Sequence, residues 1–400
     1  MRLKRIILSI LLLYCAFYKS HAQEFFPYSS SSFVADTCTL TLLFVGDLMQ
    51  HQAQIDAAHV SGDVFDYSSC FSLIKEQITR ADVAIGNLEV TLGGKPYSGY
   101  PAFSAPDEYL YAIKEAGFDV LLTANNHCLD RGKKGLERTI HLLDSLQLQH
   151  AGTYKNKEDR NRQYPLFIQK NGFRIALLNY TYGTNGLRET SPAIVNRIDT
   201  AVILKDICKA KSYNVDAIIA CMHWGQEYRM LPDESQKKLA SWLLQNGVTH
   251  IIGAHPHVIQ PMELRTDGKS QHVVVYSLGN FISNMSASNT DGGLVFTMKL
   301  RKRNVVWPVW SDLVTSMWKE HSQQEDIPFV FPSCEVEWCG YSIVWTARPK
   351  FTSNGKFVLY PVDVSLDNLS EGGKQRLNLF KKNTSNFLKK HNIGIGELKK

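Results

Sequence analysis

A short apolar run that stops abruptly at a polar cluster recurs along this 400-residue chain, and this repeated unit restricts the possible folds. Most of the runs are apolar throughout, which is typical of strands covered on both faces. Between them, apolar residues three and four positions apart, such as Leu136, Ile140 and Leu143, predict helices. The apolar runs are residues 40–45, 83–86, 120–123, 175–179, 217–221, 250–253 and 273–276.

The order of the segments predicts how they assemble. The helix-like segments between the runs are residues 71–80, 107–116, 133–146 and 234–246. Strands and helices in alternation predict an α/β fold with a parallel sheet, in which ligands bind just past the carboxyl ends of the strands. The polar clusters stand at those ends. After Gly292 the alternating segments 293–300, 341–348 and 356–362 predict antiparallel strands, and residues 366–391 predict an amphipathic helix packed on the surface.

The polar clusters offer side chains that bind metal ions. Carboxylate, amide and imidazole groups are the oxygen and nitrogen donors that divalent cations accept, and donors from five strand ends could form a one- or two-metal site. Gly46, Gly86 and Gly253 precede the donors, where a residue without a Cβ lets the backbone approach an ion closely. The candidate metal ligands are Asp47, His51, Asn87, Glu89, Asn126, His223, His255 and His257.

Each cluster also has an ordinary structural explanation. Asp47 could cap a following helix, and Asn87 with Glu89 could form an Asx turn. A single histidine after a strand is commonly a surface residue, and the His-Pro-His tripeptide at 255–257 could be a surface turn. Its proline fixes one backbone angle between two imidazoles, however, which suits a pair of ligands. Co-location favours the metal site, because independent caps and turns have no reason to supply these donors at successive strand ends.

The first 22 residues predict export to the periplasm or cell envelope. Basic residues precede the apolar run 6–17, and Ser20-His21-Ala22 offers a signal-peptidase site, so we expect cleavage after Ala22. The run is shorter than the roughly 20 residues of a permanent membrane helix, and an uncleaved anchor is the alternative. Leu13 and Tyr14 before Cys15 do not fit a lipoprotein signal. Residues 23–37, rich in serine and turn residues, indicate a linker.

Charge, cysteine spacing and missing motifs exclude several functions. Removing residues 1–22 deletes four basic residues and no acidic one, so 40 basic and 38 acidic residues leave a formal charge of +2, which does not suit nucleic-acid binding. The remaining seven cysteines fit neither a disulfide scaffold nor a zinc ribbon, although Cys334 and Cys339 could pair. Glycine-rich nucleotide-binding loops and a Gly-x-Ser-x-Gly elbow are absent from the sequence.

The ordered motifs between about residues 40 and 285 resemble those of the CapA family of capsule (poly-γ-glutamate) synthesis proteins. That family is similar in fold to calcineurin-like metallophosphoesterases, so the resemblance implies a four-layer αββα sandwich, two packed sheets flanked by helices. The domain would occupy residues 38–300, with further strands at 301–365 and a helix and tail at 366–400. The matching motifs are Gly46-Asp47-x-Met49-x-His51, Gly86-Asn87-Leu88-Glu89, Asn125-Asn126-His127 with Asp130-x-Gly132, Tyr182-Gly183-x-Asn185-Gly186, His223-Trp224-Gly225-x-Glu227-Tyr228, Gly253-Ala254-His255-Pro256-His257-Val258-x-Gln260-Pro261 and Tyr276-Ser277-Leu278-Gly279-Asn280-Phe281.

The resemblance also implies roles for these residues. It makes His127 a general acid and supports the eight metal ligands named above. Two positions depart from the phosphoesterase pattern: the spacing from Asp47 to His51 is longer than Asp-x-His, and Glu89 stands where that superfamily has a bridging aspartate. The resemblance therefore leaves the number of metal ions open, and Mn, Fe, Zn and Ca all suit mixed nitrogen and oxygen ligands.

Three hypotheses of function follow. The first is an exported metal-dependent hydrolase in the synthesis or export of an anionic capsule polymer such as poly-γ-glutamate, with His127 as general acid. The second is a non-catalytic polymer-binding or assembly factor that grips carboxylates through the same metal site. Both imply the polymer or its precursors as partners, together with a capsule-synthesis complex at the membrane, and no nucleic acid. The third is a purely structural exported domain.

Overall fold

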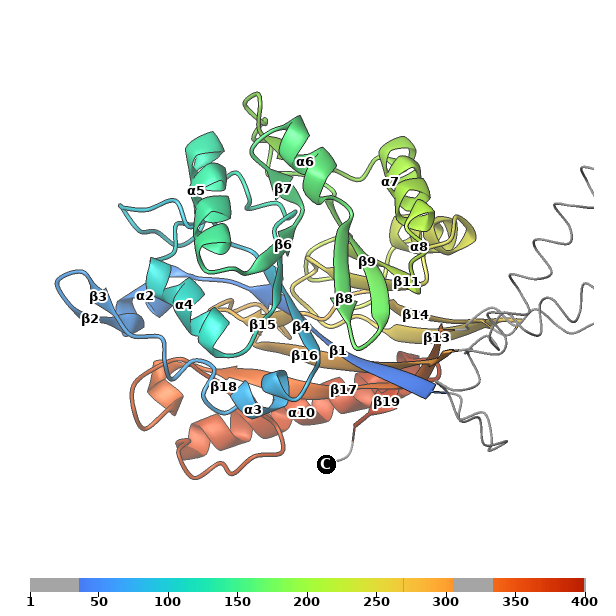
Figure 1. Ribbon diagram of the computed structural model, residues 1–400. Coiled ribbons are helices and arrows are strands. Elements are labelled where there is room, and N and C mark those ends of the chain that lie inside the picture. The colour runs from blue at the N-terminus through green and yellow to red at the C-terminus, as the bar shows by residue number, and fades with distance from the viewer. Residues whose placement is uncertain (1–35, 269, 305–333, 399–400) are drawn as a thin grey trace, which may run out of the picture. The chain divides into compact units, whose positions relative to one another are not determined.

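The computed structural model describes residues 36–268, 270–304 and 334–398 (Figure 1). The predicted signal peptide, almost all of the predicted linker and the stretch 307–332 lie outside the described residues. Within the described part of the chain no helix is long and apolar enough to span a membrane. Two large sheets dominate this part.

The first sheet joins a parallel half to an antiparallel half. In order across the sheet, its strands are β18 (Val358–Pro361), β17 (Cys334–Ala347), β16 (Gly292–Asn304), β1 (Asp36–Leu48), β4 (Val83–Leu88), β5 (Val120–Leu122) and β6 (Gln149–Ala151), with β15 (Asn280–Ile282) beside β1 and β19 (Gly396–Glu397) beside β17. β1, β4, β5 and β6 pair in parallel. β16, β17 and β18 pair antiparallel, as their alternating sequences predict. Cys334 and Cys339, both on β17, are free thiols.

The second sheet has a parallel centre with antiparallel edges. Its strands in order are β13 (Met262–Asp267), β14 (Ser270–Val275), β12 (His250–Ala254), β11 (Ala217–His223), β9 (Phe173–Thr181) and β8 (Leu166–Lys170). The four central strands run parallel, and each contains one of the predicted apolar runs. The parallel strands therefore divide between two sheets, as the family resemblance implied; the alternation of strands and helices alone did not specify the number of sheets.

Successive side chains along a strand point to opposite faces of its sheet, and each face packs against a different layer. On β1, Leu42 and Phe44 enter a core that also contains Leu177 and Ile219 of the second sheet, whereas Leu43 and Val45 face the opposite side. On that opposite side pack α3 (Lys75–Thr79), α4 (Asp107–Glu115) and α5 (Gly132–Ser145). The outer face of the second sheet packs against α7 (Thr200–Ser212) and α8 (Glu234–Gln245). The predicted sandwich of two sheets flanked by helices is confirmed.

The remaining elements are short, apart from the last helix. They are α2 (Gln52–Ala58), β2 (His59–Ser61), β3 (Val64–Phe65), β7 (Thr153–Tyr154), α6 (Lys157–Gln163), β10 (Ile194–Val195), the 3-10 helix η1 (Pro349–Phe351) and α10 (Glu371–His391). The amphipathic pattern of α10 buries Leu377 and Leu388 against the inner core, as predicted. The helix predicted at 71–80 is shorter, because its first residues form successive turns that begin at Tyr67.

Candidate metal centre

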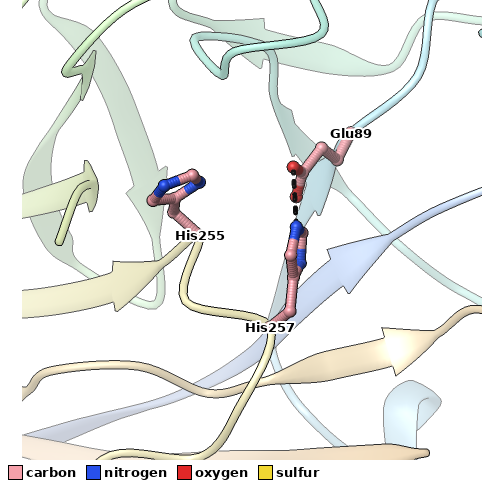
Figure 2. A group of neighbouring side chains, drawn as sticks. All are labelled: Glu89, His255 and His257. Carbon is pink, nitrogen blue, oxygen red and sulfur yellow. Dashed lines mark ion pairs between the residues drawn. The ribbon is translucent and has the colours of Figure 1, made fainter. Parts of the chain in front are cut away.

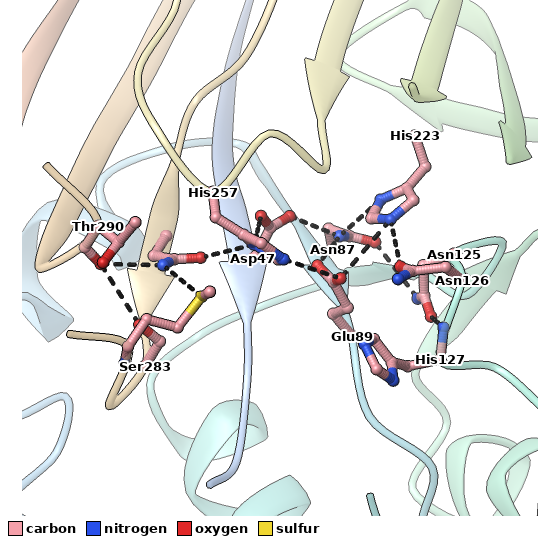
Figure 3. Close-up of polar contacts among 12 residues, drawn as sticks. Asp47, Asn87, Glu89, Asn125, Asn126, His127, His223, His257, Ser283 and Thr290 are labelled. Carbon is pink, nitrogen blue, oxygen red and sulfur yellow. Dashed lines mark hydrogen bonds and ion pairs between the residues drawn. The ribbon is translucent and has the colours of Figure 1, made fainter. Parts of the chain in front are cut away.

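The predicted donors converge from both sheets. Asp47 and Asn87 lie at the ends of β1 and β4, and Glu89 follows β4 by one residue. From the second sheet, His223 ends β11 and the 255–257 tripeptide follows β12. All of these side chains are buried. Figure 3 shows the side chains of Asp47, Asn87, Glu89, His223 and His257 close together.

The carboxylates are held by one amide rather than by helix ends or turns. The Asn87 side-chain N–H donates to Asp47 Oδ1 (2.7 Å) and to Glu89 Oε2 (3.2 Å). Asp47 therefore caps no helix, and the N-cap of α2 is His51. Since the side chains of Asn87 and Glu89 point to each other and to Asp47, the Asx-turn explanation does not hold either.

Imidazoles approach these carboxylates from the second sheet. His223 Nε2 lies 2.8 Å from Asn126 Oδ1 and 3.6 Å from Glu89 Oε1. His257 Nδ1 lies 3.1 Å from Asp47 Oδ2, and its Nε2 lies 3.8 Å from Glu89 Oε1. Figure 2 shows the His257 ring directed at the Glu89 carboxylate, with the His255 ring beside them. Glu89 is thus the carboxylate that all three histidines surround.

The backbone of the His-Pro-His tripeptide is strained. His255 and His257 have φ values of 102° and 59°, in the left-handed region that residues with a Cβ rarely adopt. Neighbouring bonds hold this shape, because the Pro256 carbonyl accepts from the Tyr228 N–H (2.8 Å) and the Ala254 carbonyl from the Trp224 N–H (3.1 Å). Non-glycine strain of this kind is characteristic of functional sites, where surrounding contacts enforce it.

The glycines before the donors serve strand packing rather than an approach to an ion. A Cβ at Gly46 would lie 1.9 Å from the Gly279 carbonyl oxygen, and one at Gly253 would lie 2.0 Å from the Tyr276 carbonyl oxygen. The absence of a side chain therefore lets neighbouring backbone segments meet at the strand ends. This differs from the role predicted for these glycines, although it still brings the donor-bearing loops together.

Burial shifts the pKa values of the cluster. Burial, followed by the nearby charge of Asp47, raises the pKa of Glu89 well above its usual range. Burial alone would also raise the pKa of Asp47, but the hydrogen bond and charge of His257 outweigh it and hold that pKa below its ordinary value. Burial lowers the pKa of His255 to about 3 and that of His223 well below its usual value. These two imidazoles are therefore neutral, as metal ligands must be.

Two buried atoms in this cluster lack a hydrogen-bond partner. They are Glu89 Oε1 and His255 Nδ1, and a buried polar atom left unpaired costs free energy. Two sets of three residues place ligand atoms within 4.8 Å of one another: Glu89 with His255 and His257, and Asp47 with Glu89 and His223. Unpaired lone pairs among converging carboxylate and imidazole groups fit a divalent cation.

A pocket of about 650 Å³ adjoins the cluster, and His51, Asn126, His127 and His257 are among the residues that line it. His127 Nδ1 lies 2.7 Å from Asp130 Oδ2, and both side chains are buried. The structure does not bring His51 into either set of potential ligands. Its backbone N–H donates to Gln54 Oε1 (2.9 Å), and its Nδ1 accepts from the Asn284 N–H (3.2 Å).

Two contributors were not among the predicted site residues. Asp130 pairs with His127, and Asn280 Oδ1 lies 3.0 Å from His257 Nδ1. Both occur within the motifs quoted for the family resemblance. Their residue types gave no further signal, because asparagine and aspartate after a strand or helix are most often turn residues.

The fold and the cluster define an α/β sandwich protein whose buried carboxylates and imidazoles could bind a metal ion. Residues 41–285 match a family described as bacterial capsule synthesis protein PGA_cap, and the chain belongs to that family. A capsule biosynthesis protein CapA of Bacillus anthracis is 32% identical over an alignment of 278 residues that covers 66% of this chain and 64% of that protein. A PGA biosynthesis protein CapA of Bacillus subtilis (strain 168) is 26% identical over an alignment of 275 residues that covers 66% of this chain and 68% of that protein.

Two solved structures align with much of this chain at low sequence identity. The NAD nucleotidase NadN of Haemophilus influenzae aligns with a TM-score of 0.45 and 11% identity, over 91% of this chain and 65% of that one. A sulfate thiohydrolase SoxB of Thermus thermophilus aligns with a TM-score of 0.41 and 11% identity, over 89% of this chain and 61% of that one.

Proposed function

We propose that this protein is exported and acts as a metal-dependent hydrolase in the synthesis or export of an anionic capsule polymer, poly-γ-glutamate or a related one. Membership of the capsule-synthesis family supports the polymer, and the signal-like residues 1–22 support export. The single observation that carries the proposed chemistry is the pair of unpaired buried atoms, Glu89 Oε1 and His255 Nδ1.

The metal ligands in this proposal come from both sheets. Asp47, Glu89, His223, His255 and His257 would hold the ion, because they form the two converging sets. Asn87 and Asn126 contact those ligands and would support them. When bound, a divalent cation polarises a carbonyl or phosphoryl oxygen and lowers the pKa of a water ligand.

His127 is the proton donor in this proposal. Its Nδ1 is engaged by Asp130, which fixes the ring and leaves Nε2 for proton transfer in the adjoining pocket. Phe103 packs against the same ring at a centroid distance of 4.6 Å, and its backbone N–H donates to the Asp130 carboxylate (2.9 Å). Asp130 is therefore held by a second bond while it orients His127.

The pocket offers no cationic side chain to an anionic polymer. None of the residues that line it, all in the described part of the chain, is lysine or arginine, and Glu227 adds a carboxylate. A bound metal ion would therefore supply the positive charge that polymer carboxylates require. This predicts that polymer binding depends on the metal.

Metal analysis and a substrate screen test the proposal together. Protein purified without chelator should contain near-stoichiometric divalent metal by mass spectrometry, and the double variant His255→Ala/His257→Ala should lose it. The loaded protein should then cleave phosphodiesters or γ-glutamyl peptides, and His127→Gln should reduce the rate about 100-fold or more while keeping the metal. Wild-type protein without metal, or a double variant that keeps it, would contradict the proposed centre.

The second candidate is a non-catalytic factor that binds the polymer or helps to assemble a capsule-synthesis complex at the membrane. The lack of lysine and arginine among the residues that line the pocket favours it specifically, because a metal ion can bind carboxylates without any catalytic group. This candidate predicts metal-dependent retention of poly-γ-glutamate with no turnover across the same screen. Fractionation of cells that express the full chain tests export, since the mature protein should begin at Gln23.

A further inference from the structure

Asn280 is buried beside the candidate ligand His257 and contacts its Nδ1, the ring nitrogen that does not face Glu89. Asn280 Oδ1 lies 3.0 Å from His257 Nδ1. The side-chain amide nitrogen of Asn280, Nδ2, donates to the Thr290 carbonyl oxygen (2.9 Å). The Thr290 carbonyl can only accept, so it fixes which end of the amide faces the histidine. The contacts from Thr290 to His257 can be followed in Figure 3.

The two neighbours of His257 Nδ1 settle which ring nitrogen carries the proton. Asp47 Oδ2, at 3.1 Å, and Asn280 Oδ1 are both hydrogen-bond acceptors, so Nδ1 must donate. In the neutral ring Nε2 then carries the lone pair, and this is the nitrogen that faces Glu89 Oε1. The ring is therefore presented to the cluster in the form that binds a metal through Nε2.

Asp47 cannot serve His257 alone if it also binds a metal ion. Its other oxygen, Oδ1, already accepts from Asn87, and the carboxylate belongs to one of the two converging sets. Asn280 belongs to neither set of potential ligands. Its Oδ1 faces His257, and its Nδ2 donates to the Thr290 carbonyl and contacts Met285 Sδ (3.3 Å). It is also the register partner of Asp47 in the pairing of β1 with β15.

We propose that Asn280 is a positioning residue that accepts a hydrogen bond from His257 Nδ1–H, so that His257 offers Nε2 to the ligand set it shares with Glu89 and His255 while Asp47 stays available to the set it shares with Glu89 and His223. This inference rests on the proposed metal site. We assign the acceptor role to Asn280 rather than to Asp47, because the contact with Thr290, outside the cluster, orients the Asn280 amide.

Elements beyond the matched family region hold Asn280 in place. Asp291, next to Thr290, accepts from Arg376 Nε of α10 (2.9 Å) and from Trp345 Nε1 of β17 (3.3 Å). The Asp291 carbonyl accepts from the Thr346 N–H (2.8 Å). The family match ends at residue 285. The C-terminal strands and helix thereby anchor the segment whose carbonyl orients the Asn280 amide.

Zinc binding and histidine spectra of the full mature chain test the inference. Asn280→Ala should weaken Zn²⁺ binding about 10–100-fold, as is typical when a supporting residue of a metal ligand is lost. Asn280→Asp keeps an acceptor for His257 but loses the N–H that donates to the Thr290 carbonyl, so it should weaken binding less than Asn280→Ala does. Arg376→Gln should cause a smaller, few-fold loss through Asp291. The matched control Arg301→Gln, which breaks the ion pair with Glu335 on the same sheet, should leave Zn²⁺ affinity unchanged.

A readout without metal separates this inference from the proposed function. In ¹⁵N-resolved histidine spectra of metal-free protein, His257 should carry its proton on Nδ1, and a proton on Nε2 would overturn the assignment. A wild-type protein that binds none of Zn²⁺, Mn²⁺, Fe²⁺ and Ca²⁺ would defeat the proposed metal site, whereas normal Zn²⁺ binding by Asn280→Ala would defeat the role of Asn280 alone. A merely structural role predicts a lower melting temperature for Asn280→Ala with unchanged Zn²⁺ affinity, which also contradicts the inference.

Discussion

The two ends of β12 each have a buried histidine, and they differ in what surrounds the ring. His250 begins the strand and His255 follows its end, and burial lowers the pKa of both to about 3. His250 Nδ1 accepts from the Val273 N–H (3.1 Å), whereas His255 Nδ1 has no partner. His255 also belongs to a set of converging ligands, and His250 does not.

This difference shows what marks a site within a core. Burial and a depressed pKa are the same at both ends, so neither property separates a ligand from a structural histidine. The distinguishing features are an unpaired lone pair and a nearby carboxylate, Glu89, whose own Oε1 is unpaired. A buried polar group whose hydrogen bond is satisfied is explained by folding alone, whereas an unpaired one among converging carboxylate and imidazole groups is a candidate for ligand binding.

Adding a metal ion should have the largest effect in distinguishing the His255 end of β12 from the His250 end. A ligand that binds only the folded state stabilises it by about 4 kcal/mol when its free concentration is 1,000 times Kd. Saturating Zn²⁺ should therefore raise the free energy of unfolding of wild type by that order, and chelator should reverse the gain. His255→Ala/His257→Ala should show no gain, while His250→Gln should keep it. A full gain in the double variant would place the stabilising ion elsewhere. Urea denaturation with and without Zn²⁺ measures the difference.

The sequence predicted the strand ends well because the signal there is local. The run 250–253 followed by His-Pro-His indicated β12 and its donors, and the runs 40–45 and 83–86 indicated β1 and β4. Resemblance to a family was needed to place the parallel strands in two sheets. Alternation of strands and helices is the same whether consecutive strands join one sheet or two, so periodicity alone could not decide.

Contacts between distant residues could not be predicted from local pattern. His257 meets Asp47 across 210 positions of sequence, and Asn280 becomes important only because Thr290 turns its amide toward His257. His51 is a different case. Its motif predicted a ligand, and the structure places it at the N-cap of α2, where its Nδ1 accepts from the Asn284 N–H and its side chain lines the pocket, so its role as a ligand stays a prediction. Residue type and spacing alone do not contain that geometry.

Loss of the His250 ring should cost stability without affecting metal. In His250→Leu the Val273 N–H loses its acceptor inside the core, and an unsatisfied buried donor costs about 1–3 kcal/mol. The free energy of unfolding should fall by that amount, measured with urea in metal-free buffer. Zn²⁺ stoichiometry should stay as in wild type. A variant that loses the metal as well would show that the two ends of β12 are coupled and would remove the contrast between them.

The pH dependence of stability gives the smallest and most specific test of His250. Its pKa is about 3 when folded and near 6.5 when unfolded, so the unfolded chain binds more protons between these values. The contribution of His250 is therefore complete above pH 6.5 and declines as pH falls toward 3, by about 0.7 kcal/mol from pH 7 to pH 6. His255 and His223 add their own declines, so the difference between wild type and His250→Gln isolates this one. Urea denaturation at both pH values should show a smaller decline in the variant. Equal declines would mean that His250 titrates alike in both states, despite its burial.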